Sequence, residues 1–304
     1  MPHRIVGIDV GSYSVKVAVI ERSFKSFAFV EFYERRVQYN DLLSPEESLG
    51  IAIQGLIDDH SLSWDVASVG FPAGRVTSRL LTFPFGSSKK IDQTVRFEIE
   101  TYIPFNVDDI VIDYTVVWST RDSSRVMVVY VQKKDLVKEL TTLESVGVDP
   151  RFICVEGVDQ VNLVNLGMVP PEGAYAIVDI GHEKSTITIC RGKNLGYVRA
   201  ISIAGKVITG TIAKRLNVPF EEAERMKVEM GRVQIGGEEV VDDITRNVTE
   251  AIRETMNELL LHLRQTFFSF HDTEGVHVEG IYLCGGTSRL PGLDRYLSDM
   301  LKLN

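Results

Sequence analysis

Residues 4–21 read RIVGIDVGSYSVKVAVIE, and residues 175–191 read YAIVDIGHEKSTITICR. Each stretch is a β-rich apolar run that ends in Asp-x-Gly, crosses a short polar turn and continues as a second β-rich run. This pattern is typical of a hairpin. The two aspartates stand at positions 9 and 179 of a 304-residue chain, so the motif recurs at about half-chain spacing. The duplication predicts two similar α/β halves.

The charge balance restricts the kinds of partner. Lys and Arg number 33 against 42 Asp and Glu, which gives a net charge of −9. Nucleic acid and anionic lipid both select faces rich in Lys and Arg, so neither is expected as the main partner. The three cysteines lack the spacing of a metal site and are expected to be reduced thiols (Cys154, Cys190, Cys284). Since no stretch approaches the ~18 apolar residues that span a bilayer, we expect a cytoplasmic protein.

The rest of the chain alternates between helical and strand patterns. Apolar residues at helical spacing predict helices at 45–59, 90–102, 133–145, 207–216, 220–230 and 242–270. Short β-rich runs predict strands at 27–37, 66–71, 110–118, 125–132 and 280–284. The last helix carries an apolar stripe that is expected to pack on the second sheet (Ile244, Val248, Ile252, Met256, Leu259, Leu263, Phe267).

These elements predict a domain organisation of three parts. We expect a first half formed by residues 1–80 and completed by 146–170, and a second half at 171–304. Residues 81–145 are expected to form a small inserted α+β subdomain, because a helix and a hairpin pattern interrupt the first half there.

The first Asp-x-Gly turn has the equipment of a phosphate site. Backbone N–H groups of a tight turn can hold phosphate oxygens, and Gly11 permits close approach because it has no Cβ. Ser12 and Ser14 add hydroxyl donors, Lys16 adds a cation, and Asp9 can hold a hydrated Mg²⁺. Asp-x-Gly is also common in plain hairpins, so this turn alone is a weak signal.

The second turn offers the same equipment in Asp179, Gly181, Ser185 and Thr186, and two such turns could hold a polyphosphate from both sides. A third element, a strand entering the Gly-Gly turn of residues 284–293, could let a purine or ribose lie against bare backbone. Its candidate contacts are Gly285, Gly286, Thr287 and Ser288. The alternative is that the duplicated hairpins and the glycine turn serve packing only.

The order of these three motifs resembles the superfamily of actin, heat-shock chaperones and sugar kinases, in which they are two phosphate motifs and an adenosine motif. The inserted segment is similar to the PilM family of type IV pilus assembly, through the residues Glu98-Ile99-Glu100-Thr101-Tyr102-Ile103-Pro104-Phe105. It resembles equally the cytoplasmic region of GspL from type II secretion. The resemblance implies an actin-like α/β fold with two RNase H-like halves and a subdomain inserted as in FtsA and PilM.

The resemblance also implies further site residues. Gly205 resembles the turn after the second hairpin, and Glu224 and Lys227 fall where relatives have a helix beside the base and ribose. Glu156 lies near the position of the residue that orients the attacking water, and it stands with Asp179 as a candidate catalytic residue. Asp9 and Asp179 are implied to hold Mg²⁺ through water.

Two departures from the superfamily pattern favour binding over fast turnover. His182, Glu183 and Lys184 replace small residues at the second hairpin, where they could crowd the terminal phosphate or displace the attacking water. Tyr13 is bulkier than the glycine of actin. We therefore expect ATP and Mg²⁺ as ligands, with at most slow hydrolysis.

The resemblance implies a cytoplasmic ATP-binding scaffold, peripheral to or tethered at the inner membrane. Its implied partners are a cytoplasmic segment of a PilN-like or GspM-like membrane protein and the hexameric motor ATPase, with homo-oligomers an open possibility. Two alternatives stay open: a sugar or small-metabolite kinase of the same superfamily, and a filament-forming protein similar to FtsA. We also expect the insert at 81–132, with its hairpin near a sheet edge, to serve recognition.

Overall fold

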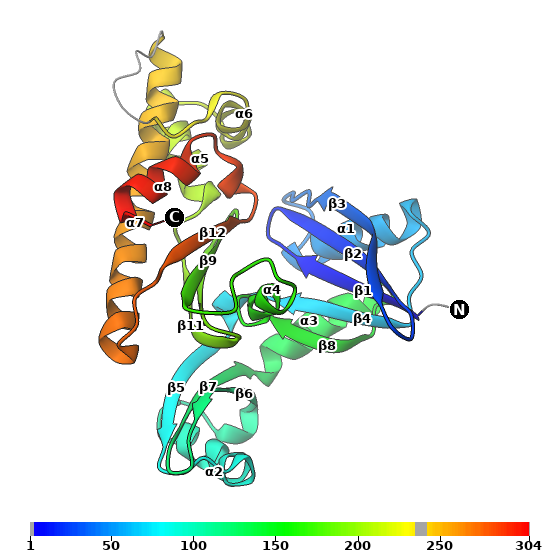
Figure 1. Cartoon of the computed structure of the whole chain (residues 1–304). Helices are drawn as coiled ribbons and strands as arrows, with labels where there is room; N and C mark the ends of the chain where they lie inside the picture. The colour runs from blue at the N-terminus through cyan, green and yellow to red at the C-terminus, as the bar shows by residue number, and fades with distance from the viewer. Residues whose placement is uncertain (1–2, 235–241, 304) are drawn as a thin grey trace. The chain divides into compact units, whose positions relative to one another are not determined.

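The duplicated motif folds as a hairpin in each of the two units into which the chain divides, residues 1–159 and residues 160–304 (Figure 1). The computed structural model describes residues 3–234 and 242–303. Each unit has a hydrophobic core of its own, so the expected pair of α/β halves is present.

The first unit is built on a five-stranded sheet with the strand order β3-β2-β1-β4-β8. Its strands are β1 (His3–Val10), β2 (Ser14–Arg22), β3 (Phe27–Arg36), β4 (Val66–Phe71) and β8 (Pro150–Val155). β1 runs antiparallel to β2 and parallel to β4, which in turn runs parallel to β8. The carboxyl ends of β1, β4 and β8 therefore meet at one edge of the sheet.

Helices α1 (Pro45–Asp59) and α3 (Lys133–Ser145) share the core of this sheet. Ile53 and Leu56 of α1 and Leu143 of α3 pack with the valines that alternate along β2. α1 begins at a capping box, in which the Glu47 N–H donates to Ser44 Oγ at 3.2 Å and the Ser44 N–H donates to Glu47 Oε2 at 2.7 Å. The sequence pattern therefore fixes both the start and the buried face of α1.

A three-stranded sheet in the order β5-β7-β6 stands between β4 and β8 in the chain. It consists of β5 (Thr77–Phe83), β6 (Ile110–Ser119) and β7 (Ser124–Gln132). Helix α2 (Ser88–Glu100) covers one face with Ile91, Val95 and Ile99. β6 and β7 form the expected hairpin, and β6 lies at an edge of this sheet.

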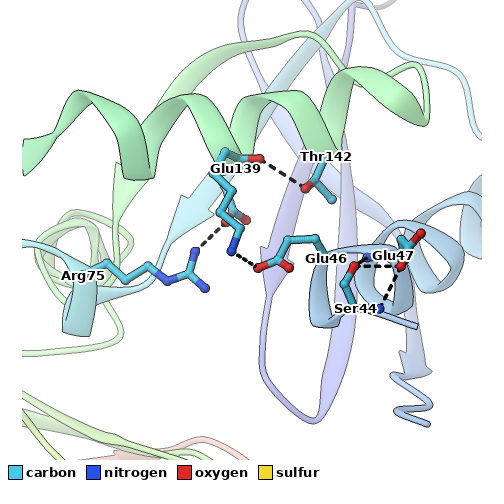
Figure 2. Close-up of polar contacts among 7 residues, drawn as sticks. Ser44, Glu46, Glu47, Arg75, Glu139 and Thr142 are labelled. Atoms are coloured by element: carbon cyan, nitrogen blue, oxygen red, sulfur yellow. Dashed lines mark hydrogen bonds and ion pairs between the residues drawn. The ribbon is translucent and has the colours of Figure 1, made fainter. Parts of the chain in front are cut away.

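Charged side chains connect the chain entering this small sheet to the helix that follows it (Figure 2). Arg75, in the short helix η1 (Ala73–Arg75), donates from Nη1 to Glu139 Oε2 of α3 at 3.1 Å. The neighbouring Lys138 forms an ion pair with Glu46 of α1 at 2.7 Å. Glu139 is only 6% exposed, and burial raises the pKa of its carboxyl although Arg75 opposes this. Arg75 therefore offsets part of the cost of burying this carboxylate.

The second unit repeats the arrangement with a four-stranded sheet in the order β11-β10-β9-β12. Its strands are β9 (Ala174–Ile180), β10 (Ser185–Arg191), β11 (Asn194–Ile201) and β12 (Gly280–Cys284). Like β1, β9 is antiparallel to the next strand and parallel to a strand that arrives after a helical connection. Its helices are α4 (Asn162–Asn165), α5 (Gly205–Leu216), α6 (Phe220–Met230), α7 (Asp243–Glu274) and α8 (Leu293–Leu301).

The long helix α7 contributes most of the predicted stripe to the second core. Val248, Ile252, Met256, Leu259 and Leu263 are fully buried there, and Phe267 packs against the core partly exposed. The predicted core position of Ile244 is wrong, because this side chain is 48% exposed. Ile244 lies in the first turn of α7, whereas the buried positions of this helix begin at Val248.

The sequence patterns did not predict three of the strands that the structure describes: β5, β8 and β11. β5 reads TSRLLTF and β8 begins at Pro150, so neither presents a continuous β-rich run. Helix α2 was predicted at 90–102. It begins two residues earlier, at Ser88, and ends two residues earlier, at Glu100. Its end is explained by Pro104, because a residue that precedes proline disfavours helical backbone. Among the described residues, none of the helices has the length and apolar character that a membrane span requires.

The Arg75–Glu139 pair can be tested by its pH dependence. Arg75→Met should lower the free energy of unfolding by roughly 1–3 kcal/mol at pH 7, because it leaves a buried carboxylate without its partner. The raised pKa means that the folded state holds the Glu139 proton more tightly than the unfolded chain does. The loss should therefore be smallest below pH 4.5, the ordinary pKa of this group, and grow as the pH rises through the raised value.

Urea unfolding at acidic and neutral pH measures this loss. The control is Arg75→Met combined with Glu139→Gln, which removes the charge and should recover most of the stability at pH 7. A loss that does not change with pH, or a double variant as unstable as the single one, would contradict the assignment.

Candidate functional site

The first Asp-x-Gly turn follows β1 at the sheet edge where β1, β4 and β8 end. Asp9 stands directly opposite Lys16 in the β1–β2 ladder, and Lys16 Nζ donates to Asp9 Oδ2 at 3.1 Å. The Asp9 side chain is 63% exposed, so its carboxylate remains accessible to solvent. This exposed carboxylate with a neighbouring ammonium group suits a hydrated cation and a phosphate.

Gly11 and Ser14 shape this turn. A Cβ at Gly11 would lie 2.7 Å from the Ser14 carbonyl oxygen, so the close turn requires glycine. Ser14 is buried, and its hydroxyl donates to Glu34 Oε1 of β3 at 2.6 Å. Of the two serines predicted to donate to phosphate, Ser14 thus has an internal partner, whereas Ser12 is half-buried in the turn.

Glu156 follows β8 at the same sheet edge. Its N–H donates to the Phe71 carbonyl at 3.0 Å, and its Oε2 accepts from the Ala73 N–H at 3.1 Å. The carboxylate is therefore fixed by the turn between β4 and η1. The candidate water-orienting residue therefore lies at the end of β4, the strand between β8 and the Asp9 strand β1.

The second Asp-x-Gly turn is joined to the Gly-Gly turn after β12. Asp179 pairs with Cys284 across the parallel ladder, and Gln160 Nε2 donates to Asp179 Oδ2 at 3.4 Å. Gly285 has φ +87°, and a Cβ there would lie 2.3 Å from Asp179 Oδ1. Glycine is required at this position for both its backbone conformation and its close contact.

The Gly181 carbonyl joins three segments that are distant in the sequence. It accepts the Gly205 N–H at the start of α5 at 3.1 Å and the Thr287 hydroxyl at 2.7 Å. A Cβ on Gly205 would lie 2.6 Å from Thr287 Oγ1. The structure thus brings together the predicted second phosphate turn, the predicted turn at Gly205 and the predicted adenosine motif.

The hydroxyl groups of the second turn do not line an open surface. Ser185 is fully buried and donates to the Ile203 carbonyl at 2.5 Å, and Thr186 is 1% exposed. Ser288 donates to the Gly285 carbonyl at 2.7 Å, which closes the glycine turn. These residues hold the shape of the site, as does the Gly181 N–H, which donates to the Lys184 carbonyl at 2.9 Å.

Glu224 and Lys227, one helical turn apart on α6, form a buried ion pair at 2.7 Å. Lys227 Nζ also donates to Thr209 Oγ1 at 2.9 Å and to the Gly205 carbonyl at 3.2 Å. Burial lowers the pKa of Lys227, against the effect of Glu224. Burial opposes ionisation of Glu224 as well, but hydrogen bonds from Lys227 and Thr209 bring its pKa below the ordinary value. The pair therefore anchors α6 to the first turn of α5.

Sequence reasoning missed Thr209 and treated His182 only as a departure. The His182 ring lies edge-on to Phe220, with ring centroids 6.3 Å apart, and burial lowers the pKa of its imidazole. Glu183 is ion-paired with Lys206 at 2.6 Å, so its carboxylate lies at the start of α5. The helical pattern of the sequence places Thr209 within α5. Only the packing of α6 on α5 shows that the Thr209 hydroxyl forms hydrogen bonds with Glu224 and Lys227.

The residues of the second unit fit a bound nucleoside. A Cβ at Gly286 would meet nothing within 4 Å, so this backbone borders open space beside the tightly packed Gly285 and Gly205. In the part of the chain that the structure describes, no group of three His, Cys, Asp or Glu side chains is arranged as a direct metal site.

Comparisons with known proteins agree with this architecture. The family model for the type IV pilus assembly protein PilM matches residues 7–304. A solved PilM–PilN type IV pilus biogenesis complex is similar with a TM-score of 0.83 and 24% identity, covering 99% of this chain and 86% of that chain. MreB5 of Spiroplasma citri, solved with AMPPNP, has a TM-score of 0.57 at 11% identity and covers 99% and 90% of the two chains.

Curated relatives include the cell division protein FtsA of Staphylococcus epidermidis. The protein of strain ATCC 12228 is 24% identical over 98% of this chain and 73% of its own length. In strain ATCC 35984 the match covers 57% of this chain and only 40% of the relative. Because the family match extends over nearly all of the sequence, the chain belongs to the PilM family of type IV pilus assembly proteins and has an actin-like fold.

Proposed function

We propose that this chain is an ATP-binding scaffold of type IV pilus assembly. The observation that carries the proposal is the convergence on the Gly181 carbonyl, where the Gly205 N–H and the Thr287 hydroxyl meet beside the open backbone of Gly286. This arrangement leaves bare backbone for a flat base and ribose, and it holds the second Asp-x-Gly turn in a fixed shape.

Each of the two units carries one proposed phosphate-binding turn, and each turn is taken in its own unit. The first supplies Gly11, the Ser12 hydroxyl and the Lys16 ammonium, with Asp9 for hydrated Mg²⁺. The second supplies the carboxylate of Asp179, in a turn that the internal hydrogen bonds of Gly181 hold in shape. Bound Mg²⁺ would neutralise charge on the phosphates. Support comes from relatives with the same fold, such as MreB5 of Spiroplasma citri, which was solved with AMPPNP.

The internal hydrogen bonds favour binding over rapid turnover. Ser14 and Ser185 both donate to partners inside their own unit, and the Glu156 carboxylate accepts from the Ala73 backbone. A group that already has such a partner must give it up before it can orient water. We therefore expect hydrolysis that is slow at most, as suits a scaffold.

The scaffold role implies two protein partners. Membership of the PilM family and the likeness to a PilM–PilN complex support a PilN-like membrane protein as one of them. The hexameric motor ATPase is the other, and the chain would associate with the inner membrane through the PilN-like protein. Co-purification of this chain with the cytoplasmic N-terminal segment of the PilN-like protein tests the role. Failure of the two to associate, with and without ATP, would contradict it.

The carboxylates at the two turns should govern Mg²⁺-dependent binding. Asp9→Asn and Asp179→Asn keep the side-chain shape and remove the charge, so each should weaken ATP binding by about tenfold or more when Mg²⁺ is present. The effect should be smaller in EDTA. Titration calorimetry measures both, with Asp41→Asn, on an exposed loop, as the matched control. Unchanged affinity in both variants would overturn the phosphate assignment.

The glycine turn should determine whether the base and ribose can bind. Gly286→Val puts a branched side chain into space that is open in the folded protein, so the fold should persist while ATP affinity is lost. Gly210→Val on α5 is the matched control, because a Cβ there also meets nothing within 4 Å. Thermal unfolding and ATP titration separate the two effects. A Gly286→Val protein that binds ATP as the wild type does would remove the adenosine assignment.

A further inference from the structure

We propose that the open edge of β6 pairs with the same edge of a second copy of this chain, in a two-fold antiparallel arrangement. The proposal stands apart from nucleotide binding, because it uses only the inserted three-stranded sheet. β6 is an edge strand of that sheet, and between it and α2 runs a groove of about 440 Å³. Its charged lining residues are Asp92, Arg96, Asp113 and Lys133.

The hydrogen bonding of Tyr114 identifies which backbone groups face the open edge. Its N–H donates to Asp113 Oδ1 at 2.8 Å, so this donor does not enter the ladder with β7. In an antiparallel pair, alternate residues direct both backbone groups to the same side. Ile110, Ile112 and Tyr114 therefore present N–H and C=O groups outward, whereas Val111 and Asp113 pair with β7.

The three residues with outward backbone groups suit antiparallel pairing with a second copy about a two-fold axis at Ile112. Ile112 would pair with Ile112 of the second copy, and Ile110 with Tyr114 of the second copy. All of these would be hydrogen-bonded pairs, in which the Tyr114 N–H exchanges its bond to Asp113 Oδ1 for one to Ile110 of the second copy. Ile110, Ile112 and Tyr114 belong to the core under α2, so pairing extends the sheet and leaves that core intact. Two three-stranded sheets would become one six-stranded sheet.

The charges along the groove are complementary under this symmetry. Asp92 and Asp113 lie at the Tyr114 end, where Asp92 accepts a hydrogen bond from the Tyr114 hydroxyl. Lys133 lies at the other end, since it follows Gln132, the partner of Ile110. Arg96 lies there too, but Asp108 already neutralises it. Antiparallel pairing brings the Lys133 end of each copy to the acidic end of the other, whereas parallel pairing would oppose like charges.

A second copy is the occupant that the observations favour. It carries the complementary charges by symmetry, and a self-complementary patch is what a two-fold interface requires. In the single chain, Asp113 satisfies the outward Tyr114 N–H and so protects the edge from indiscriminate pairing. Only five residues pair, so the dimer should be weak and depend on protein concentration.

A charge swap tests the register. Lys133→Asp puts two acidic ends together, and Asp113→Lys puts two basic ends together, so each variant alone should dimerise at least about tenfold more weakly than the wild type. Mixing the two variants should restore association, because each then meets its opposite charge. Lys134→Asp is the matched control, and sedimentation over a concentration series gives the dissociation constants.

Cysteine cross-linking tests the pairing itself. Val111 would face Asp113 of the second copy as a pair without hydrogen bonds, at a Cα separation of about 4.5 Å, within disulfide range. A mixture of Val111→Cys and Asp113→Cys chains should therefore form a covalent dimer on mild oxidation. Either variant alone should form far less, because identical residues lie diagonally at about 7–8 Å. The wild type controls for Cys154, Cys190 and Cys284.

Several outcomes would overturn the proposal. A chain that remains monomeric at the highest concentration it tolerates has no such interface. A dimer that survives both charge reversals, or cross-links equally in single variants and the mixture, uses another surface. If the charge reversals abolish capture of the PilN-like segment while the wild type is monomeric, the edge serves that partner instead. None of these results depends on ATP affinity, so failure here is distinguishable from failure of the nucleotide site.

Discussion

The second unit depends on one carbonyl group. Gly181 O receives the Gly205 N–H and the Thr287 hydroxyl, and Gly205 in turn holds Lys227 through its own carbonyl. This short chain of hydrogen bonds fixes the second turn, the start of α5, the helix α6 and the glycine turn after β12 in one arrangement. A Cβ at Gly205 or Gly285 would intrude on it, so the two glycines are structural necessities of the site.

The buried pair of Glu224 and Lys227 extends this constraint into α6. Both side chains are less than 10% exposed, and each carries a charge that the interior disfavours. The hydrogen bonds through Thr209 and the Gly205 carbonyl compensate for that cost. The pair fixes where α6 lies against α5, which explains why two charged residues occupy positions that an apolar pair would otherwise suit.

Much of the fold follows from local patterns. The hairpins, α1 and most of α7 were predictable, because alternation, a capping box and an apolar stripe are all contained in short windows. β5 and β8 were missed, because their pairing partners lie elsewhere in the chain. β11 was missed although it pairs with β10, the strand directly before it. Asp9, Gly181 and Gly285 lie at the strand ends and turns of their motifs. The internal bonds of Ser14 and Ser185 depend on β3 and on Ile203, and they could not be predicted from the motif. The predicted burial of Ile244 was wrong, because an apolar stripe does not show at which helical turn the core begins.

The Arg75–Glu139 contact also has a mechanical consequence. The chain enters the three-stranded sheet just after Arg75 and leaves it into α3, the helix that carries Glu139. The ion pair therefore bridges the two connections at the base of the insert (Figure 2). The insert is thus held at its base by two covalent connections and by one contact between their side chains. Loss of this contact would leave the insert attached through the backbone alone at these two points, so its orientation within the first unit would be less constrained.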